Sequence, residues 1–330
     1  MKKALLITLL YLTIIICLSA VCVYYMDPIH KCLLGWKKEY IRDKEYKTMH
    51  QEKVDIAYLS KLHDDSTAWY KKYHFIGHGG GAINGKTYTN SLEAWDYSYE
   101  HGNRVVDADM TFTSDSVLVL RHSWGDNLEH SPLSMQNSSS VFVDRNGHTQ
   151  YRLPERRQSY QEFSSHKIHY LYTPLSCKDM ILFMKEHSDF YVSTDMKDDI
   201  VQSYTYLVNQ ARKMKCEDVL DRIIINFYEY EDYNRIMKIY PFKNVTARQH
   251  YVHPNNYTEL IDFCVKHNIH VINVSSCYAK DEGIKDILSK GINVYVAVVD
   301  YISDMKEYKK RGFFGACTNY LHEDEWKYIN

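Results

Sequence analysis

The sequence is poor in the residues that interrupt regular structure. Its 330 residues include only 13 glycines and 6 prolines, which excludes collagen-like and low-complexity classes. Neither sign of charge dominates, because 40 Lys and Arg stand against 42 Asp and Glu and the formal net charge is -2. A domain that binds nucleic acid usually has an excess of basic residues, and this chain has none, so we expect no nucleic-acid partner. Hydrophobic residues make up 45% of the chain, enough for a packed core.

Charge is almost absent from the amino terminus. Lys2 and Lys3 precede residues 4–26, an uncharged run rich in Leu, Ile and Val. As a helix this run would extend about 34 Å, enough to cross a hydrocarbon layer of about 30 Å. We therefore expect residues 1–26 to form a single-pass, membrane-anchoring transmembrane helix, with the remainder of the chain extracytoplasmic. A cleaved secretory signal or a lipid anchor is the alternative.

The cysteines show no paired short spacing of the kind that marks a zinc site. Cys17 and Cys22 fall within the apolar run. The others permit disulfides, although Cys264 and Cys317 lie in apolar segments and are expected to be buried free thiols. Those outside the run are Cys32, Cys177, Cys216, Cys264, Cys277 and Cys317.

Beyond the apolar run, the chain divides into a short linker and one larger domain. Residues 27–70 are charged and predict a membrane-proximal linker. In residues 71–330 short apolar runs alternate with amphipathic stretches, which predicts strands that alternate with helices in a parallel sheet. Seven or eight such units favour a TIM (β/α)8 barrel, with a doubly wound open sheet as the alternative. The expected strands are residues 75–76, 104–110, 117–120, 190–196, 222–227, 245–248, 270–274, 292–299 and 313–318.

One polar, serine-rich stretch interrupts this alternation. Residues 123–170 show no clear periodicity, and loops of this length usually carry function or are disordered. The stretch follows the expected strand at 117–120. We therefore expect it to be an insertion at the carboxyl end of a barrel strand, where active sites of such barrels lie.

Residues capable of catalysis follow the expected strands. His78 ends the first strand and is followed by three glycines. Asp107 and Asp109 are two apart on a strand, so both carboxylates point to one face. Burying two carboxylates is costly unless a cation or hydrogen-bond donors offset them. Because Mg²⁺ and Ca²⁺ are bound by carboxylates, the pair predicts a divalent cation site.

Two further strand ends repeat this chemistry. Arg121 and His122 follow the strand at 117–120, and Asp195 and Lys197 place an acid and a base two apart. Together these elements supply two histidines for proton transfer, three acids for a cation and fixed positive charge.

The order and spacing of these motifs resemble the glycerophosphodiester phosphodiesterase family, within the barrel-fold phospholipase C-like phosphodiesterases. The resemblance runs from about residue 75 to residue 321. It rests on His78, Thr89-Asn90-Ser91-Leu92-Glu93-Ala94, Gly102 with Asp107-Ala108-Asp109, Thr111 to Asp115, His122, Asp195-x-Lys197 and the tail at residues 312–319.

The sequence departs from the family pattern at several positions. Gly79 stands where the family has an arginine that holds phosphate, and Arg121, Lys197 or Arg156 is a candidate to replace it. The other departures are Thr89 in place of Glu, Asp107 in place of Glu, Ser123 in place of Asp and Asn319 where the last strand normally ends Thr-Asp.

The resemblance implies metal-assisted cleavage of a glycerophosphodiester or a related lipid headgroup phosphodiester. It assigns His78 as general acid and His122 as general base, with Lys197 and Arg121 on the phosphate. Asn90 is expected to cap a helix or to line the mouth, or alternatively to support catalysis and substrate binding. One Ca²⁺ or Mg²⁺ is expected on Asp107, Asp109 and Asp195.

Two other functions stay open at this point. A catalytically impaired protein that binds phosphodiesters is motivated by the missing arginine. A sphingomyelinase D-like or phosphoinositide-type phospholipase would use the same barrel.

Overall fold

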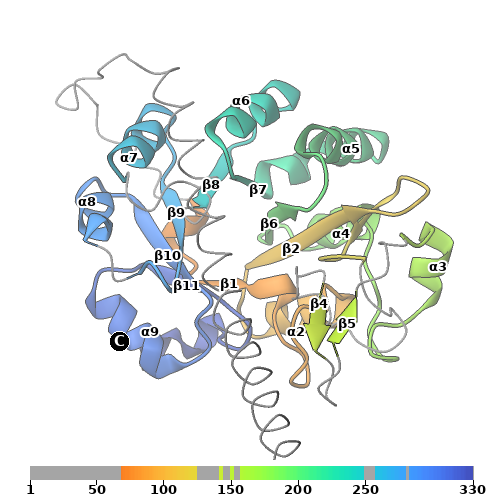
Figure 1. Ribbon diagram of the computed structural model, residues 1–330, viewed down its shortest axis with the longest axis horizontal. Coiled ribbons are helices and arrows are strands. Elements are labelled where there is room, and N and C mark those ends of the chain that lie inside the picture. Colours follow the sequence, from red (N-terminus) through yellow and green to blue (C-terminus); the bar gives the residue numbers. More distant parts are fainter. Residues whose placement is uncertain are drawn as a thin grey trace, which may run out of the picture. The chain divides into compact units, whose positions relative to one another are not determined.

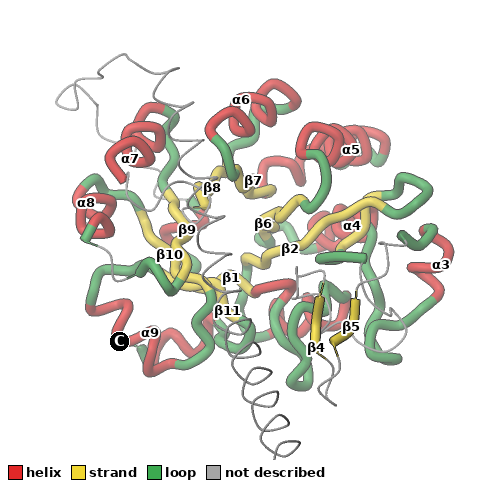
Figure 2. The backbone as a smooth tube through the Cα atoms, in the orientation of Figure 1, coloured by secondary structure: helices red, strands yellow, loops and turns green. Residues whose placement is uncertain are grey.

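The computed structural model of the protein describes residues 68–124, 141–143, 149–151, 157–248, 257–279 and 282–329. Within these residues, eight parallel strands form a closed barrel with helices around it (Figures 1 and 2). The barrel strands are β1 (Phe75–Gly77), β2 (Val105–Phe112), β6 (Tyr191–Met196), β7 (Ile223–Phe227), β8 (Asn244–Arg248), β9 (Val271–Ser275), β10 (Asn293–Ala297) and β11 (Gly315–Thr318).

Closure of the barrel depends on the pairing of its first two strands. The sheet runs in the order β1-β11-β10-β9-β8-β7-β6-β2, and β1 also pairs with β2 through Gly77 and Val106. An open sheet would leave β1 and β2 as unpaired edges. The predicted TIM barrel is therefore confirmed, and the doubly wound alternative is wrong.

The helices begin where short polar side chains cap them. Ser91, Ser176 and Asp199 each accept a hydrogen bond from the first helical turn, at α2, α4 and α5 respectively. The helices around the barrel are α2 (Leu92–Glu100), α4 (Cys177–Glu186), α5 (Ile200–Lys213), α6 (Tyr230–Ile239), α7 (Tyr257–Lys266), α8 (Gly283–Ser289) and α9 (Ile302–Lys310), with short 3-10 turns η5 (Glu217–Arg222) and η6 (Glu323–Tyr328).

One expected barrel strand has a different role. Strand β3 (Leu118–Leu120) pairs antiparallel with the end of β2, so it forms a hairpin and is not part of the barrel wall. The prediction that residues 117–120 end at the carboxyl edge of a parallel strand is therefore wrong. The short turn after Phe112 reverses the chain, and β3 carries Arg121 back to the level of Asp109, whose carbonyl accepts its backbone N–H at 2.7 Å.

The amino-terminal end of the barrel is closed by aromatic side chains. Trp69 and Tyr70 of η2 (Trp69–Lys71) pack with interior residues of the barrel strands and are buried. The expected linker boundary at residue 70 therefore falls inside a segment that packs on the barrel. The interior residues of this cluster are Ile76, Val105, Ile224, Val271, Tyr295 and Cys317.

Part of the predicted insertion is described. It contains strands β4 (Val141–Val143) and β5 (Thr149–Tyr151), which pair with each other, and helix α3 (Tyr160–Ser165). Arg157 anchors its end by an ion pair with Asp198, next to the barrel mouth. Arg156 lies outside the described residues.

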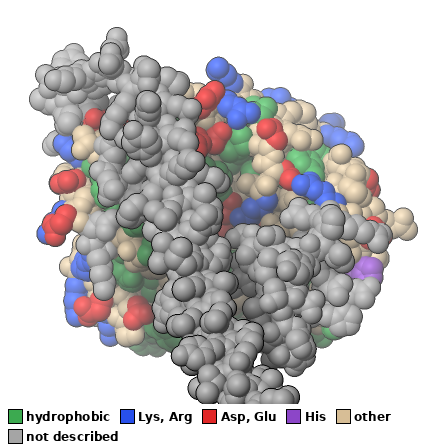
Figure 3. All heavy atoms as spheres, viewed as in Figure 1, with side chains coloured by type: hydrophobic (Ala, Val, Ile, Leu, Met, Phe, Trp, Pro, Cys, Tyr) green, Lys and Arg blue, Asp and Glu red, His purple; other side chains and the backbone are tan. Residues whose placement is uncertain are grey.

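The predicted anchor at residues 1–26 and most of the linker also lie outside the described residues. Among the helices that are described, we find none with the length and hydropathy of a membrane span. In the part of the chain that the structure describes, five cysteines are free thiols, and Cys264 and Cys317 are buried as predicted. On the described part of the face in Figure 3, acidic and basic side chains are interspersed.

Candidate active site

The site is built on two neighbouring barrel strands. Strands β2 and β6 pair in a register that sets Asp109 directly beside Asp195, and the two-residue period places Asp107 on the same inward face. All three carboxylates are buried, with exposures of 2%, 2% and 8% for Asp107, Asp109 and Asp195. Carboxylate oxygens of the three residues lie within 4.8 Å of one another. The three acids that the sequence indicates as cation ligands thus lie together, and their role as ligands stays a prediction.

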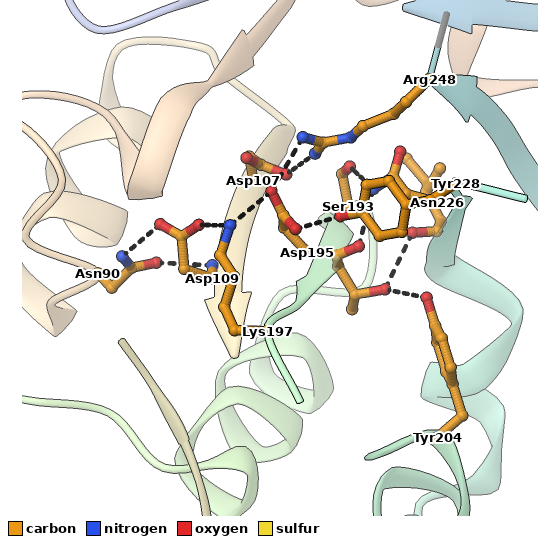
Figure 4. A network of polar contacts seen from close by, with 12 residues as sticks. Asn90, Asp107, Asp109, Ser193, Asp195, Lys197, Tyr204, Asn226, Tyr228 and Arg248 are labelled. Carbon is orange, nitrogen blue, oxygen red and sulfur yellow. Dashed lines mark hydrogen bonds and ion pairs between the residues drawn. The ribbon is translucent and has the colours of Figure 1, made fainter. Parts of the chain in front are cut away.

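Two basic side chains neutralise most of this charge (Figure 4). Lys197 Nζ lies 2.9 Å from both Asp109 Oδ1 and Asp195 Oδ2. Arg248, at the end of β8, lies 2.9 Å from both Asp107 Oδ1 and Asp195 Oδ2. Three carboxylates and two cations leave one net negative charge when all groups are ionised.

Neutral polar groups fix the orientation of the acids. Asn90 Nδ2 donates to Asp109 Oδ2 at 3.1 Å, and its Oδ1 accepts the Asp109 backbone N–H at 3.1 Å. The Tyr228 hydroxyl donates to Asp195 Oδ1. Asn90 has a left-handed φ of 47°, which turns its side chain toward β2 and leaves capping of α2 to Ser91. The expectation that Asn90 caps the helix is therefore wrong.

The three aspartates differ in acidity. Burial raises the pKa of Asp107 to about 7, although Arg248 acts in the opposite direction. Burial also acts to raise the pKa of Asp109, but the ion pair with Lys197 outweighs it and the pKa is lowered. Asp195 is buried too, and Arg248 and Lys197 together hold its pKa well below the usual range. Asp107 is thus the acid whose charge is least well compensated.

His78 lies at the end of β1, in the short turn η3 (His78–Gly80). Its ring packs edge-on against Tyr88, with centroids 4.1 Å apart. Burial lowers its pKa to about 4, so the imidazole is neutral at pH 7. The next residue, Gly79, has φ 54°, and a Cβ there would stand 2.8 Å from Tyr88 Cα. This backbone therefore excludes the arginine that the family carries at Gly79.

The hairpin of β2 and β3 brings the second histidine to the same place. His122 follows Arg121, and the charges of both His122 and His78 act on Asp109. Both histidines thus lie near the acid cluster. His122 does so because the hairpin of β2 and β3 returns the chain to this end of the barrel. Arg121 is buried, and its Nε donates to the Ser123 carbonyl while its guanidinium lies 5.2 Å from the ring of Trp124. Its binding of phosphate stays a prediction.

Several residues of the site were not predicted from the sequence. Arg248 and Tyr228 approach the acids from β8 and the end of β7, and Cys317 reaches the interior from β11. Their position at the ends of predicted strands could have indicated them, because the last residues of all barrel strands lie at the carboxyl-terminal face, where active sites form.

The donor set suits a hard divalent cation. Three carboxylates converge, and the acid with the raised pKa, Asp107, is short of positive charge in the described structure. Adding a divalent cation to a net charge of -1 gives +1, which a singly charged phosphodiester would bring to zero. Asp107, Asp109 and Asp195 are therefore the residues that would hold such an ion.

Comparisons with known proteins identified a family model that matches the chain and solved structures with a similar fold. Residues 78–323 match the model of the glycerophosphoryl diester phosphodiesterase family. A search of curated proteins found no match. Among solved structures, the chain is similar to a putative glycerophosphodiester phosphodiesterase from Galdieria sulphuraria, with 14% identity, a TM-score of 0.59 and coverage of 78% of this chain and 97% of that one.

Two further structures show the same fold. A putative glycerophosphoryl diester phosphodiesterase from Silicibacter pomeroyi is 13% identical with a TM-score of 0.58, covering 78% of this chain and 93% of that one. A phosphodiesterase from Oleispira antarctica, in complex with the product sn-glycerol-3-phosphate, is 12% identical with a TM-score of 0.57, covering 78% and 96%. The match of the family model covers well over half of the chain. The chain therefore belongs to the glycerophosphoryl diester phosphodiesterase family, a family of phosphoric diester hydrolases.

Proposed function

We propose that the chain hydrolyses glycerophosphodiesters, or related lipid headgroup phosphodiesters, with the help of one divalent cation, Ca²⁺ or Mg²⁺. The observation that carries this proposal is the convergence of three buried carboxylates beside two histidines. The Oleispira antarctica phosphodiesterase, whose structure contains sn-glycerol-3-phosphate, supports a small phosphodiester substrate.

When bound, the cation would supply Lewis-acid polarisation of the phosphoryl group and lower the pKa of the attacking hydroxyl. The residues of the chain do the rest. Asp107, Asp109 and Asp195 would hold the cation. Asn90 fixes the rotamer of Asp109 through two hydrogen bonds.

The two histidines move protons. A histidine that is neutral at pH 7 can accept a proton, and burial keeps His78 in that state. We therefore assign His78 as the base that takes the proton of the nucleophile and His122 as the acid that protonates the leaving oxygen. This reverses the assignment implied by the family resemblance.

Arg248 is the candidate for the missing phosphate-holding guanidinium. It lies at the carboxyl end of β8, and its Nε is buried with no hydrogen-bond partner among the described residues. A phosphoryl oxygen would satisfy this donor, and a guanidinium suits phosphate oxygens in particular. With Arg248 present, the absence of an arginine at Gly79 no longer argues for an impaired, binding-only protein.

The test is ³¹P NMR of the full chain with glycerophosphocholine, glycerophosphoethanolamine and lysophospholipids, each with and without chelator. We expect at least one to give a phosphomonoester or cyclic phosphate only when the cation is present. Absence of turnover on every substrate, with the fold intact, would contradict the proposal. We also propose that residues 1–26 anchor the chain in a membrane with its barrel outside the cytoplasm, which fractionation and protease protection would test.

A further inference from the structure

The interior of the barrel holds a thiol beside the catalytic acids. Cys317 lies on β11 and is 4% exposed. It packs in the interior cluster at the amino-terminal end of the barrel, which also contains Ile76 and Tyr295. The charges of Asp107 and Arg248 act on its sulfur, and burial raises its pKa well above the usual value. The thiol is therefore protonated in the free enzyme and has no part in the proposed hydrolysis.

This thiol belongs to a second set of potential metal ligands. Ligand atoms of His78, Asp107 and Cys317 lie within 4.8 Å of one another. His78 Nδ1 is buried and has no hydrogen-bond partner among the described residues. A buried ring nitrogen without a partner is an incomplete polar contact, and a metal ion is one of the groups that complete it.

The chemistry of this set differs from that of the three aspartates. Imidazole, thiolate and carboxylate together are the ligands of Zn²⁺ and Co²⁺, whereas Mg²⁺ and Ca²⁺ take oxygen. A tetrahedral ion with bonds of about 2.0–2.3 Å separates its ligands by about 3.3–3.8 Å, so the three atoms need to approach by about 1.5 Å at most. Rotation of side chains achieves a shift of this size.

The two sets share Asp107, so they compete for one carboxylate. We propose that a thiophilic divalent cation, with Zn²⁺ as the prototype, binds His78, Asp107 and Cys317 and thereby inhibits the enzyme. Binding forms a metal–sulfur bond and releases the Cys317 proton to solvent. It also occupies His78 and withdraws Asp107 from the three-aspartate set. The inhibitory part of this inference rests on the proposed function, whereas the binding part does not.

Co²⁺ is the probe for binding, because a thiolate ligand gives a cobalt charge-transfer absorption in the near ultraviolet and a carboxylate site does not. We expect the full chain to show this absorption on titration with Co²⁺, and Cys317→Ser to lose it. The matched control is Cys277→Ser, since Cys277 is an exposed thiol in the loop after β9. Cys277→Ser should keep the absorption. Cys317→Ala, which adds no polar group to the interior, replaces the serine variant if circular dichroism shows that serine disturbs the fold.

Turnover supplies the second readout. With saturating Mg²⁺ or Ca²⁺, whichever supports activity, Zn²⁺ should inhibit the unmodified chain at least thirtyfold more tightly than it inhibits the Cys317 variant. Each chain is scaled to its own zinc-free rate. Equal inhibition of both, or cobalt absorption that persists without Cys317, would overturn the inference. A chain that hydrolyses no phosphodiester but shows Cys317-dependent absorption would refute the proposed function and leave the metal site standing.

Discussion

Replacing Arg248 by methionine tests whether one guanidinium balances two of the three buried acids. Arg248 contacts Asp107 Oδ1 and Asp195 Oδ2, both at 2.9 Å. Methionine keeps the apolar stem and removes the charge. Asp195 would keep Lys197 and Tyr228 as partners, whereas Asp107 would lose its ion-pair partner. The cost should therefore depend on whether Asp107 is ionised.

The magnitude follows from the pKa of Asp107, which burial raises to about 7. At pH 6, Asp107 is mostly protonated in both proteins, so the variant loses mainly the contact with Asp195, a cost of about 1–2 kcal/mol. Above pH 7 the unmodified protein ionises Asp107 beside Arg248, but the variant has to keep its proton. This adds about 1.4 kcal/mol for each pH unit, or about 2.7 kcal/mol at pH 9. The total of about 4 kcal/mol lies within the range of about 3–5 kcal/mol that removal of one partner of a buried ion pair typically costs.

The assay is urea unfolding of both proteins at pH 6 and pH 9 in the presence of chelator. Arg235→Met is the matched control, because the Arg235 side chain is 43% exposed and pairs with the exposed Asp199 and with Asp232. Its cost should stay below about 1 kcal/mol at both pH values. If Arg248→Met costs the same at pH 6 and pH 9, ionisation of Asp107 does not depend on Arg248.

Two further predictions concern catalysis. His78→Ala should lower turnover about 10²–10⁴-fold on every substrate. His122→Ala should lower turnover by the same factor on glycerol or choline esters, but by less than tenfold on bis(p-nitrophenyl) phosphate, because its leaving group needs no proton. If the two variants show the opposite pattern, His122 is the base and His78 is the acid. Asn90→Ala removes both hydrogen bonds to Asp109 and should raise the cation concentration for half-maximal activity about 10–100-fold. Asn84→Ala, at a position with similar left-handed φ, is the control and should leave that concentration unchanged, so equal shifts in both variants would indicate a backbone effect alone.

The strands and helices could be predicted from the sequence because apolar runs alternate with amphipathic stretches over most of the domain. The acids were accessible for the same reason: Asp107 and Asp109 interrupt an apolar strand, and a two-residue period leaves them on one face. A polar residue inside a buried strand is informative without knowledge of its neighbours.

The contacts between distant segments could not be predicted from the local sequence pattern. Arg248 pairs with Asp107 across 141 residues, and nothing local to Arg248 distinguishes it from other basic residues at strand ends. The pairing direction of β3 depends on the turn after Phe112, which the apolar pattern of residues 117–120 does not encode. Trp69 and Tyr70 follow a charged stretch, so only the closed barrel reveals that they form its floor.

The proposed phosphodiester cleavage depends on a cation held by the three aspartates. The most direct measurement is a Mn²⁺ titration of the metal-free chain, followed by electron paramagnetic resonance and by turnover in parallel. We predict that turnover rises in proportion to the first bound Mn²⁺, and that the double variant Asp107→Asn, Asp109→Asn neither binds that ion nor turns over substrate. Full turnover by the double variant, or by the unmodified chain in chelator, would show that cleavage does not depend on this cation.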